Sequence, residues 1–316
     1  MIELFALRND RIERLESLKG FGPSRGVSWV RCVEPVEADL ESISELLRMP
    51  LQDLKESVEE DARSKLTVGR HIELIFSVPS MSEGEVLTVP LHIFAVGSLL
   101  VTVERKSIKV LGDLSRALLE NKRRFLFRKH TAYFIYYVLD KVNDEFLYFV
   151  DKISLKLELF RERKALSKDA IQKIYDTSIT LSYFNQSLIA NIDVLNELRK
   201  SYFRMFSQED RDNFSEIYYD ALQVLDTEKI QRELLSNLFS MHSTLIGNEL
   251  NYFMRIVALV ALLSTVPMLI TSIFSMNIRN VPLVQGEHAF FVILGLIAAS
   301  SVASFILFRW FARKWQ

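Results

Sequence analysis

Small and polar side chains recur along one side of a long helical stretch near the end of the chain. Steps of three or four residues give the stripe Ser240, Ser243, Gly247, Asn251, Met254, Val257 (or Ala258), Ala261, Thr265, Met268 and Ser272. Symmetry copies around a pore would offer amide and hydroxyl oxygens to a hydrated cation, with Met254 and Val257 as an apolar gate. Small residues at this spacing also let neighbouring helices pack closely. Periodicity alone leaves both interpretations open.

The sequence shows few motifs typical of catalytic, nucleotide-binding or zinc-binding sites. The chain has no phosphate loop, no G-x-G-x-x-G and no C-x-x-C, and its five histidines show no H-x-x-x-H spacing for zinc. We therefore expect neither an enzyme nor a covalently bound cofactor. The net charge of −1 gives no argument for nucleic acid as a partner. The single cysteine, Cys32, agrees with a reducing compartment, and its hydrophobic neighbours predict a buried thiol.

Two uncharged stretches predict membrane-spanning helices. Residues 256–274 and 289–308 are each about 20 residues long, which is enough to cross ~30 Å of hydrocarbon. Basic residues flank the pair on the side of the two termini, at Arg255, Arg309, Arg313 and Lys314. The intervening loop has Arg279 set against Glu287. The bias of Lys and Arg toward the cytoplasm then predicts a multi-pass protein of the inner membrane with both termini cytoplasmic.

The distribution of glycine and proline divides the rest of the chain. Neither occurs between Asp113 and Ile246, which predicts long helices. Before that point, strand-like runs cover residues 1–7, 29–33, 71–78, 87–94 and 99–104, and helical spacing covers 37–49 and 51–60. Helices are expected at about 109–119, 128–164, 167–203 and, without a break, 207–274.

These elements predict an α+β cytoplasmic domain followed by long helices and two C-terminal transmembrane helices. The expected parts are an α/β domain (1–110), a helical hairpin (111–206), a stalk helix continuing into the first span (207–274), an external loop (275–288), the second span (289–308) and a basic tail (309–316). A helix as long as the stalk would not be stable alone in water, so it must pack on neighbours and on copies of itself.

With this order of elements, the chain resembles the CorA magnesium/cobalt transporter family over essentially its whole length. That family has Tyr-Gly-Met-Asn at the outer end of the first span, where this chain has Phe274-Ser275-Met276-Asn277. Three further segments look like family sequence in the same order: SLIANIDVL (187–195), EDRDNFSEIYYDALQVLD (209–226) and VPMLIT (266–271).

The resemblance implies a funnel-shaped homopentamer that passes divalent cations, Mg²⁺ with Co²⁺ or Ni²⁺, through a pore lined by the first spans. Family pore positions fall on Asn251, Met254, Val257, Ala261 and Thr265, and the stripe continues through Met268 and Ser272. Ser275, Met276 and Asn277 would form the entrance, with the Asn277 amide binding a hydrated cation. Magnesium gives up water reluctantly, so outer-shell hydrogen bonds from amides suit it. The expected partners are copies of the chain, membrane lipids and divalent cations.

The chain departs from the family pattern at the entrance and at the regulatory site. Ser275 replaces glycine, Phe274 replaces tyrosine, and Arg279 follows the motif where the family's loop carries an acid, so we expect weaker cation capture. On the long helix, Glu216 falls where the family binds regulatory magnesium, but its partner region carries Arg70 and no acid. We hypothesise that an Arg70–Glu216 ion pair replaces the bridging metal, the alternative being that Arg70 faces solvent.

Two other functions stay open at this point. The first is transport of Zn²⁺ or another divalent ion, with proton coupling as in the zinc-transporting branch of the same superfamily. The second is a non-conducting scaffold, in which the paired spans anchor a helical cytoplasmic oligomer.

Overall fold

The computed structural model describes residues 1–8, 11–15, 26–58, 62–82, 85–161, 168–200, 206–276 and 288–314. The chain divides into two compact units, Met1–Leu238 and Phe239–Gln316. The division falls inside one helix, α7 (Gln208–Phe274), which is 67 residues long and therefore about 100 Å at 1.5 Å per residue. The unbroken helix expected from Ser207 to Phe274 is confirmed.

The first unit is built on a seven-stranded sheet in the order β2-β1-β3-β7-β6-β5-β4. Its strands are β1 (Ile2–Arg8), β2 (Arg11–Leu15), β3 (Ser28–Val33), β4 (Lys65–Val68), β5 (Ile72–Ser82), β6 (Glu85–Val96) and β7 (Leu99–Glu104). Neighbours are antiparallel except β3 and β7, which run parallel. The hairpin between β6 and β7 turns at Gly97, whose φ of 57° is a left-handed conformation that glycine adopts without strain.

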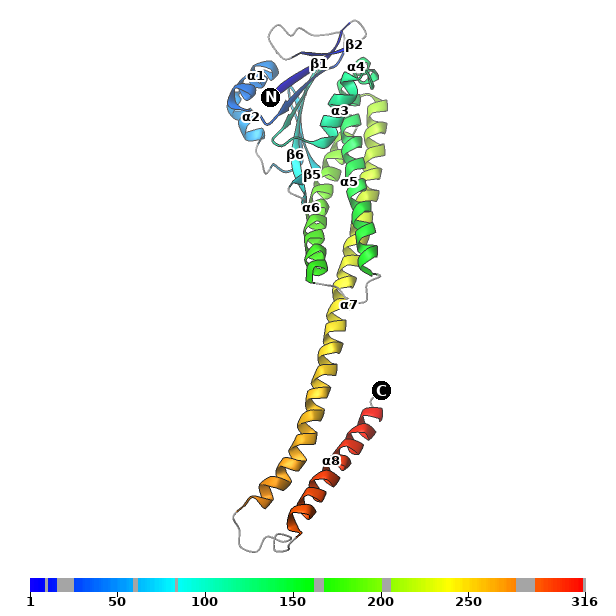
Figure 1. Ribbon diagram of the computed structural model, residues 1–316. Helices are drawn as coiled ribbons and strands as arrows, with labels where there is room; N and C mark the ends of the chain where they lie inside the picture. Colours follow the sequence, from blue (N-terminus) through cyan, green and yellow to red (C-terminus); the bar gives the residue numbers. More distant parts are fainter. Residues whose placement is uncertain are drawn as a thin grey trace. The chain divides into compact units, whose positions relative to one another are not determined.

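Helices cover both faces of this sheet (Figure 1). One face carries α1 (Glu37–Leu47) and α2 (Leu51–Ser57), which bury Cys32 together with aliphatic residues of the sheet. The other carries α3 (Lys109–Leu119), α4 (Phe125–Arg128), α5 (Thr131–Arg161), α6 (Lys168–Leu198) and the beginning of α7. Trp29 of β3 stacks on Phe5 at 5.1 Å between ring centroids and contacts Phe134 of α5 at 5.6 Å. The sheet and the long helices therefore share one hydrophobic core.

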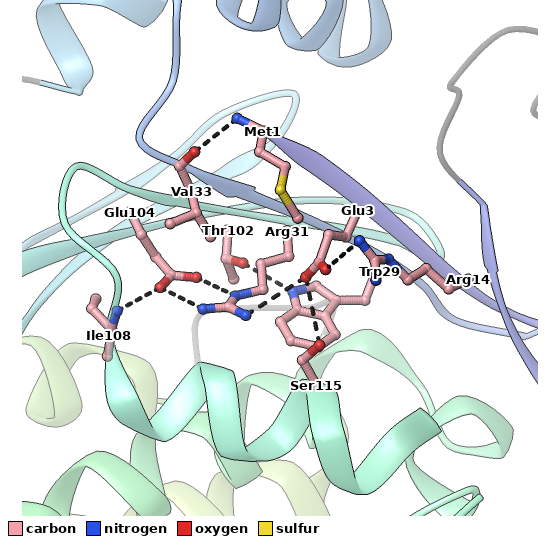
Figure 2. A network of polar contacts seen from close by, with 10 residues as sticks. All are labelled: Met1, Glu3, Arg14, Trp29, Arg31, Val33, Thr102, Glu104, Ile108 and Ser115. Carbon is pink, nitrogen blue, oxygen red and sulfur yellow. Dashed lines mark hydrogen bonds and ion pairs between the residues drawn. The ribbon is translucent and has the colours of Figure 1, made fainter. Parts of the chain in front are cut away.

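A buried ionic network ties the centre of the sheet to α3 (Figure 2). Arg31 Nε donates to Glu104 Oε1 at 2.6 Å and Arg31 Nη2 donates to Glu104 Oε2 at 3.0 Å. The same Oε2 accepts the backbone N–H of Ile108 at 2.8 Å, directly before α3 begins. Arg31 Nη1 also lies 3.6 Å from Glu3 Oε2, and Arg14 of β2 pairs with Glu3 at 3.0 Å. The network therefore joins the strands β1, β2, β3 and β7.

An amide of α6 completes the edge of the sheet just before β4 begins. Asn191, which is 1% exposed, donates from Nδ2 to the Ser77 carbonyl at 2.9 Å and accepts the Ser77 N–H at Oδ1, also at 2.9 Å. Ser64, just before β4, donates its hydroxyl to the same Oδ1 at 2.8 Å. The side-chain amide thus supplies the donor and the acceptor that a continued β4 would have offered β5.

Most of the expected elements are present, but α4 is not among the predictions, and α6 ends at Leu198, before the expected end at residue 203. Strands β2 and β4 lie outside the predicted runs, because β2 is rich in charge and β4 is an edge strand with little burial, so neither alternates clearly. Helix α5 begins at Thr131 and not near Arg128, because Lys129 is extended and His130 Nδ1 accepts the N–H of Tyr133 at 3.2 Å, which caps the helix. Residue 167, the expected start of the next helix, lies outside the described residues.

Candidate ion pathway along α7

The first turn of α7 is held by a capping box and by a contact with α5. Ser207 donates its N–H and its hydroxyl to Asp210 Oδ2 at 2.8 and 2.7 Å, and Asp210 N–H donates to Ser207 Oγ at 3.1 Å. His130 Nε2 lies 3.3 Å from Asp210 Oδ1, and Asp210 is 2% exposed. The spacing Ser-x-x-Asp is a known pattern for such a box, whereas no sequence signal indicates that His130 joins it.

Beyond Leu238, most side chains of α7 are exposed. Within the second unit, large apolar side chains of α7 are open, including Tyr252 (67% exposed), Phe253 (60%) and Met268 (72%). Helices α7 and α8 (Ala289–Lys314) both contain a stretch long and apolar enough to cross a membrane, and these stretches are almost entirely unburied. Surfaces of this kind need lipid or further protein around them.

One face of α7 in this unit lies toward α8, which runs back alongside it (Figure 1). Reduced exposure marks this face on α7 at Leu259, Leu263, Val266, Pro267, Ile270 and Phe274. The matching positions on α8 are Ala289, Ile293, Ile297, Ser300, Ser301, Ser304 and Phe308. Both sets recur every three or four residues, as expected for two helices packed along their length.

The polar stripe lies on the opposite face of α7. Ala261, Thr265, Met268 and Ser272 each follow a residue of the α8-facing set by two positions, which is a rotation of about 200° around a helix with 3.6 residues per turn. All four are exposed, as are Asn251, Met254 and Val257. The seven stripe residues therefore remain uncovered in a single copy of the chain, on the side away from α8.

The wall that this face offers is electrically neutral. From residue 250 to 276 the one charged side chain is Arg255, and no acid occurs. The Thr265 hydroxyl donates to the Ala261 carbonyl at 2.7 Å, so its oxygen lone pairs remain for an outside donor. Such a wall can touch a cation's water shell through oxygen dipoles, but it holds no carboxylate that would replace those waters.

At the C-terminal end of α7, the helical turn continues through Ser275. Ser275 N–H donates to the Thr271 carbonyl at 3.0 Å, its hydroxyl donates to Ser272 at 2.9 Å, and Met276 N–H donates to Ile273 at 3.3 Å. Neither Ser275 nor Met276 has a positive φ. The Ser275 hydroxyl proton, expected at the entrance, is thus engaged in closing the helix. Asn277, Arg279 and Glu287 lie outside the described residues.

The two residues of the predicted regulatory pair are apart in a single chain. Arg70 is exposed in the bend after β4 and makes no ion pair with any residue the structure describes. Glu216 Oε2 accepts the Tyr136 hydroxyl at 3.5 Å. Burial, with Glu216 adding to it, raises the pKa of Tyr136 to about 12. In the part of the chain that the structure describes, no three His, Cys, Asp or Glu side chains gather into a metal site.

One hydrolase-like pattern occurs near the N-terminus. Residues 22–26 read Gly-Pro-Ser-Arg-Gly, which fits G-x-S-x-G. A nucleophile elbow needs a strand before the serine and a helix after it, whereas here the strand β3 follows. Gly26 is the described residue of this run, and it gives no support for such a site.

One known protein family matches almost the whole chain. The family model described as "CorA-like Mg2+ transporter protein" matches residues 24–313. The chain belongs to the CorA-like Mg²⁺ transporter family. It is a divalent cation transporter of the CorA type. The stripe and spans described above therefore belong to a protein whose family moves ions across membranes.

Individual CorA relatives agree with this membership. The chain is 27% identical over 283 residues to the cobalt/magnesium transport protein CorA of Methanocaldococcus jannaschii, covering 89% of each chain. The complete structure of the CorA magnesium transporter from that organism superposes with a TM-score of 0.89 at 26% identity, covering 98% of this chain and 97% of that one. The full-length CmaX protein shares the fold, with a TM-score of 0.76 at 16% identity and the same coverage.

Proposed function

We propose that five copies of this chain form a pore for Mg²⁺, with the stripe of α7 as its wall. The observation that carries the proposal is the position of the stripe: it faces away from α8 and is uncovered in one copy. In a ring of copies with α8 outside, this face of α7 would point toward the common axis. Similarity over nearly the whole chain to the solved CorA magnesium transporter of M. jannaschii supports magnesium as the ion.

Each part of the proposed pore has a distinct task. Asn277 amides at the outer mouth, with Ser275 and Met276 beside them, would bind a magnesium ion through its water shell. Ala261, Thr265, Met268 and Ser272 would pass the hydrated ion along a neutral wall. Further in, rings of Met254 and Val257 would close the path by excluding water, and Asn251 would receive the ion on the cytoplasmic side.

Orientation in the inner membrane follows from the basic residues at the inner ends of both spans. Arg255 precedes the first apolar stretch and Arg309 follows the second. Attraction of Lys and Arg to the cytoplasmic side keeps the first unit and both termini inside.

Regulation would differ from that of a metal-gated relative. We infer that Arg70 of one protomer pairs with Glu216 of its neighbour, so that a fixed ion pair stands where a bridging metal would bind. Magnesium titration should then leave the protease sensitivity of the first unit unchanged. A magnesium-dependent change in cleavage would refute this pairing.

Ion flux tests the proposal directly. The purified protein in proteoliposomes should take up Mg²⁺ in competition with Co²⁺ and Ni²⁺, and Asn277→Ala should remove most of this uptake. Thr265→Val should reduce it, whereas Thr271→Val, which changes another exposed threonine of α7 that lies off the stripe, should not. Uptake of Zn²⁺ alone, driven by a proton gradient, would favour the zinc transporter. Absence of any flux would favour the scaffold.

A further inference from the structure

A groove in the first unit has no part in the ion pathway. It has a volume of about 650 Å³ and lies between α5 and α6, with Met81 near the end of β5 and Val86 and Leu87 near the beginning of β6 over one side. Its floor is apolar and buried: Phe149 is 6% exposed, Ile153 7% and Ala170 3%. Ligand sites of small molecules are concave, largely apolar spaces of this size, roughly 300–1,000 Å³.

The mouth of the groove is apolar and open as well. Met81, from the end of β5, is 57% exposed, and Leu159 of α5 is 62% exposed. Both side chains line the same groove as the buried floor. The apolar surface therefore runs continuously from the interior to the outside, which is the shape that a long apolar chain can enter.

The acidic side chains around the groove have polar partners, whereas two of its lysines have no carboxylate partner among the described residues. Asp169 lies 3.9 Å from Lys173, and Asp176 accepts a hydrogen bond from Gln172 Nε2 at 2.9 Å. Lys152 and Lys156, one turn apart on α5, have no carboxylate partner among the described residues. Lys152 instead lies 5.8 Å from the centroid of the Tyr148 ring. The acids of the rim thus have partners, while two ammonium groups are left for an anion.

From the floor, the open mouth and the two lysines together, we propose that the groove binds a long-chain carboxylate of the fatty-acid class. The alkyl chain would cover Phe149, Ile153 and Ala170, and the carboxylate would pair with Lys152 and Lys156 at the rim. A small anion would leave the apolar floor uncovered, and a neutral hydrocarbon would leave both lysines unpaired. A two-chain phospholipid would have twice the alkyl chain to bury in the same volume.

Such a ligand would add contacts among elements that already pack against one another. It would touch α5, α6 and the β5–β6 hairpin at once, and so stabilise the first unit by mass action. All three elements belong to one compact unit, so the site is complete in a single chain. The proposal does not depend on whether the protein transports magnesium.

Photolabelling of the full chain tests this site. The protein in lipid nanodiscs is exposed to palmitic acid carrying a diazirine on its alkyl chain, irradiated, digested and mapped by mass spectrometry. Label is expected in peptides covering residues 149–160 and 169–180, and excess unlabelled palmitate should remove it. Label in the spans 256–274 and 289–308 reports partition into the bilayer and serves as the internal reference.

Two comparisons decide the outcome. Lys152→Ala/Lys156→Ala should lower groove label at least tenfold relative to the spans, while Lys55→Ala/Lys229→Ala, which removes two exposed lysines elsewhere, should leave it unchanged. A diazirine hexadecanol of equal length should label the groove at least tenfold less than the acid. Label confined to the spans, equal label in Lys152→Ala/Lys156→Ala, or equal label by the alcohol would each overturn the proposal.

Discussion

At the scale of single residues, a buried ion pair connects strands that are far apart in the sequence. Glu104 is fully buried and Arg31 is 6% exposed, so each depends on the other for compensation. Burial raises the pKa of Glu104 above its ordinary value, against the lowering effect of Arg31 and of the Ile108 N–H. Removing one partner of such a pair leaves an uncompensated charge in the interior, which is far more harmful than losing a surface pair.

Arg31→Met should therefore destabilise the first unit by about 3–5 kcal/mol. Chemical denaturation followed by the fluorescence of the buried Trp29 would measure this loss. Arg116→Met, which removes an exposed pair with Asp113, is the control and should cost less than about 1 kcal/mol. Arg31→Met/Glu104→Gln should recover part of the loss, and a double variant as unstable as the sum of both single changes would contradict the compensation.

The outer end of α7 also depends on a single side chain. Because the Ser275 hydroxyl donates to the Ser272 carbonyl, we expect it to stabilise the last turn without selecting the ion. Ser275→Ala should keep the order of preference among Mg²⁺, Co²⁺ and Ni²⁺ in uptake competition. A tenfold change in that preference would show that the hydroxyl contacts the ion.

At the scale of elements, the contact between α6 and α7 contains a carboxylate that burial disfavours. Glu228 of α7 is fully buried and accepts a hydrogen bond from Asn185 Nδ2 of α6 at 2.8 Å. Arg232 lies 3.5 Å away but is itself partly exposed. Burial raises the pKa of Glu228, with Asn185 and Arg232 opposing the shift. The charge thus weakens the packing of these two helices.

Glu228→Gln should make the first unit more stable at pH 7, because glutamine can keep the bond to Asn185 without a buried charge. A raised pKa in the folded state means that the folded chain holds this proton longer. Stability of the unchanged protein should then fall as pH rises from about 4.3, the unfolded value, through the folded pKa. Thermal unfolding at several pH values would show the two proteins converging below about pH 4. The exposed Glu233→Gln should show no such effect, and lower stability of Glu228→Gln at every pH would refute the argument.

At the scale of the whole molecule, the proposed pore needs more than one copy of the chain. The apolar stretch of α7 is unburied, and its polar stripe has no partner on the side away from α8 among the residues that the structure describes. A lipid bilayer satisfies the apolar surface, but a stripe with Asn251 and Thr265 is better satisfied by copies of itself around water. In the proposed pore, the pathway therefore exists only when several copies of the chain assemble.

Cysteine crosslinking should detect that assembly. Ala261→Cys on the stripe should form disulfides between copies under oxidation, whereas Ala303→Cys, exposed on α8, should not. The native Cys32 will not interfere, because it is fully buried and burial raises its pKa to about 12. Gel electrophoresis would measure the products, and equal crosslinking at both positions would contradict an inner ring of α7.

Features that depend on neighbours along the chain follow from the amino-acid sequence without further information. The absence of Gly and Pro from 113 to 246 predicts the long helices, and the uncharged runs predict both spans. Steps of three and four residues are enough to find the stripe from Asn251 to Ser272. These properties are local because helix formation and hydropathy are set within a few turns.

Which distant residues meet depends instead on how the sheet and the helices pack. Arg31 and Glu104 are 73 positions apart, and Asn191 reaches Ser77 across 114. No periodicity reports such pairs, since they exist only when the sheet and helices share a core. The same holds for the direction of the stripe: sequence spacing shows that it is one face of a helix, but only the position of α8 shows that this face is turned away from α8.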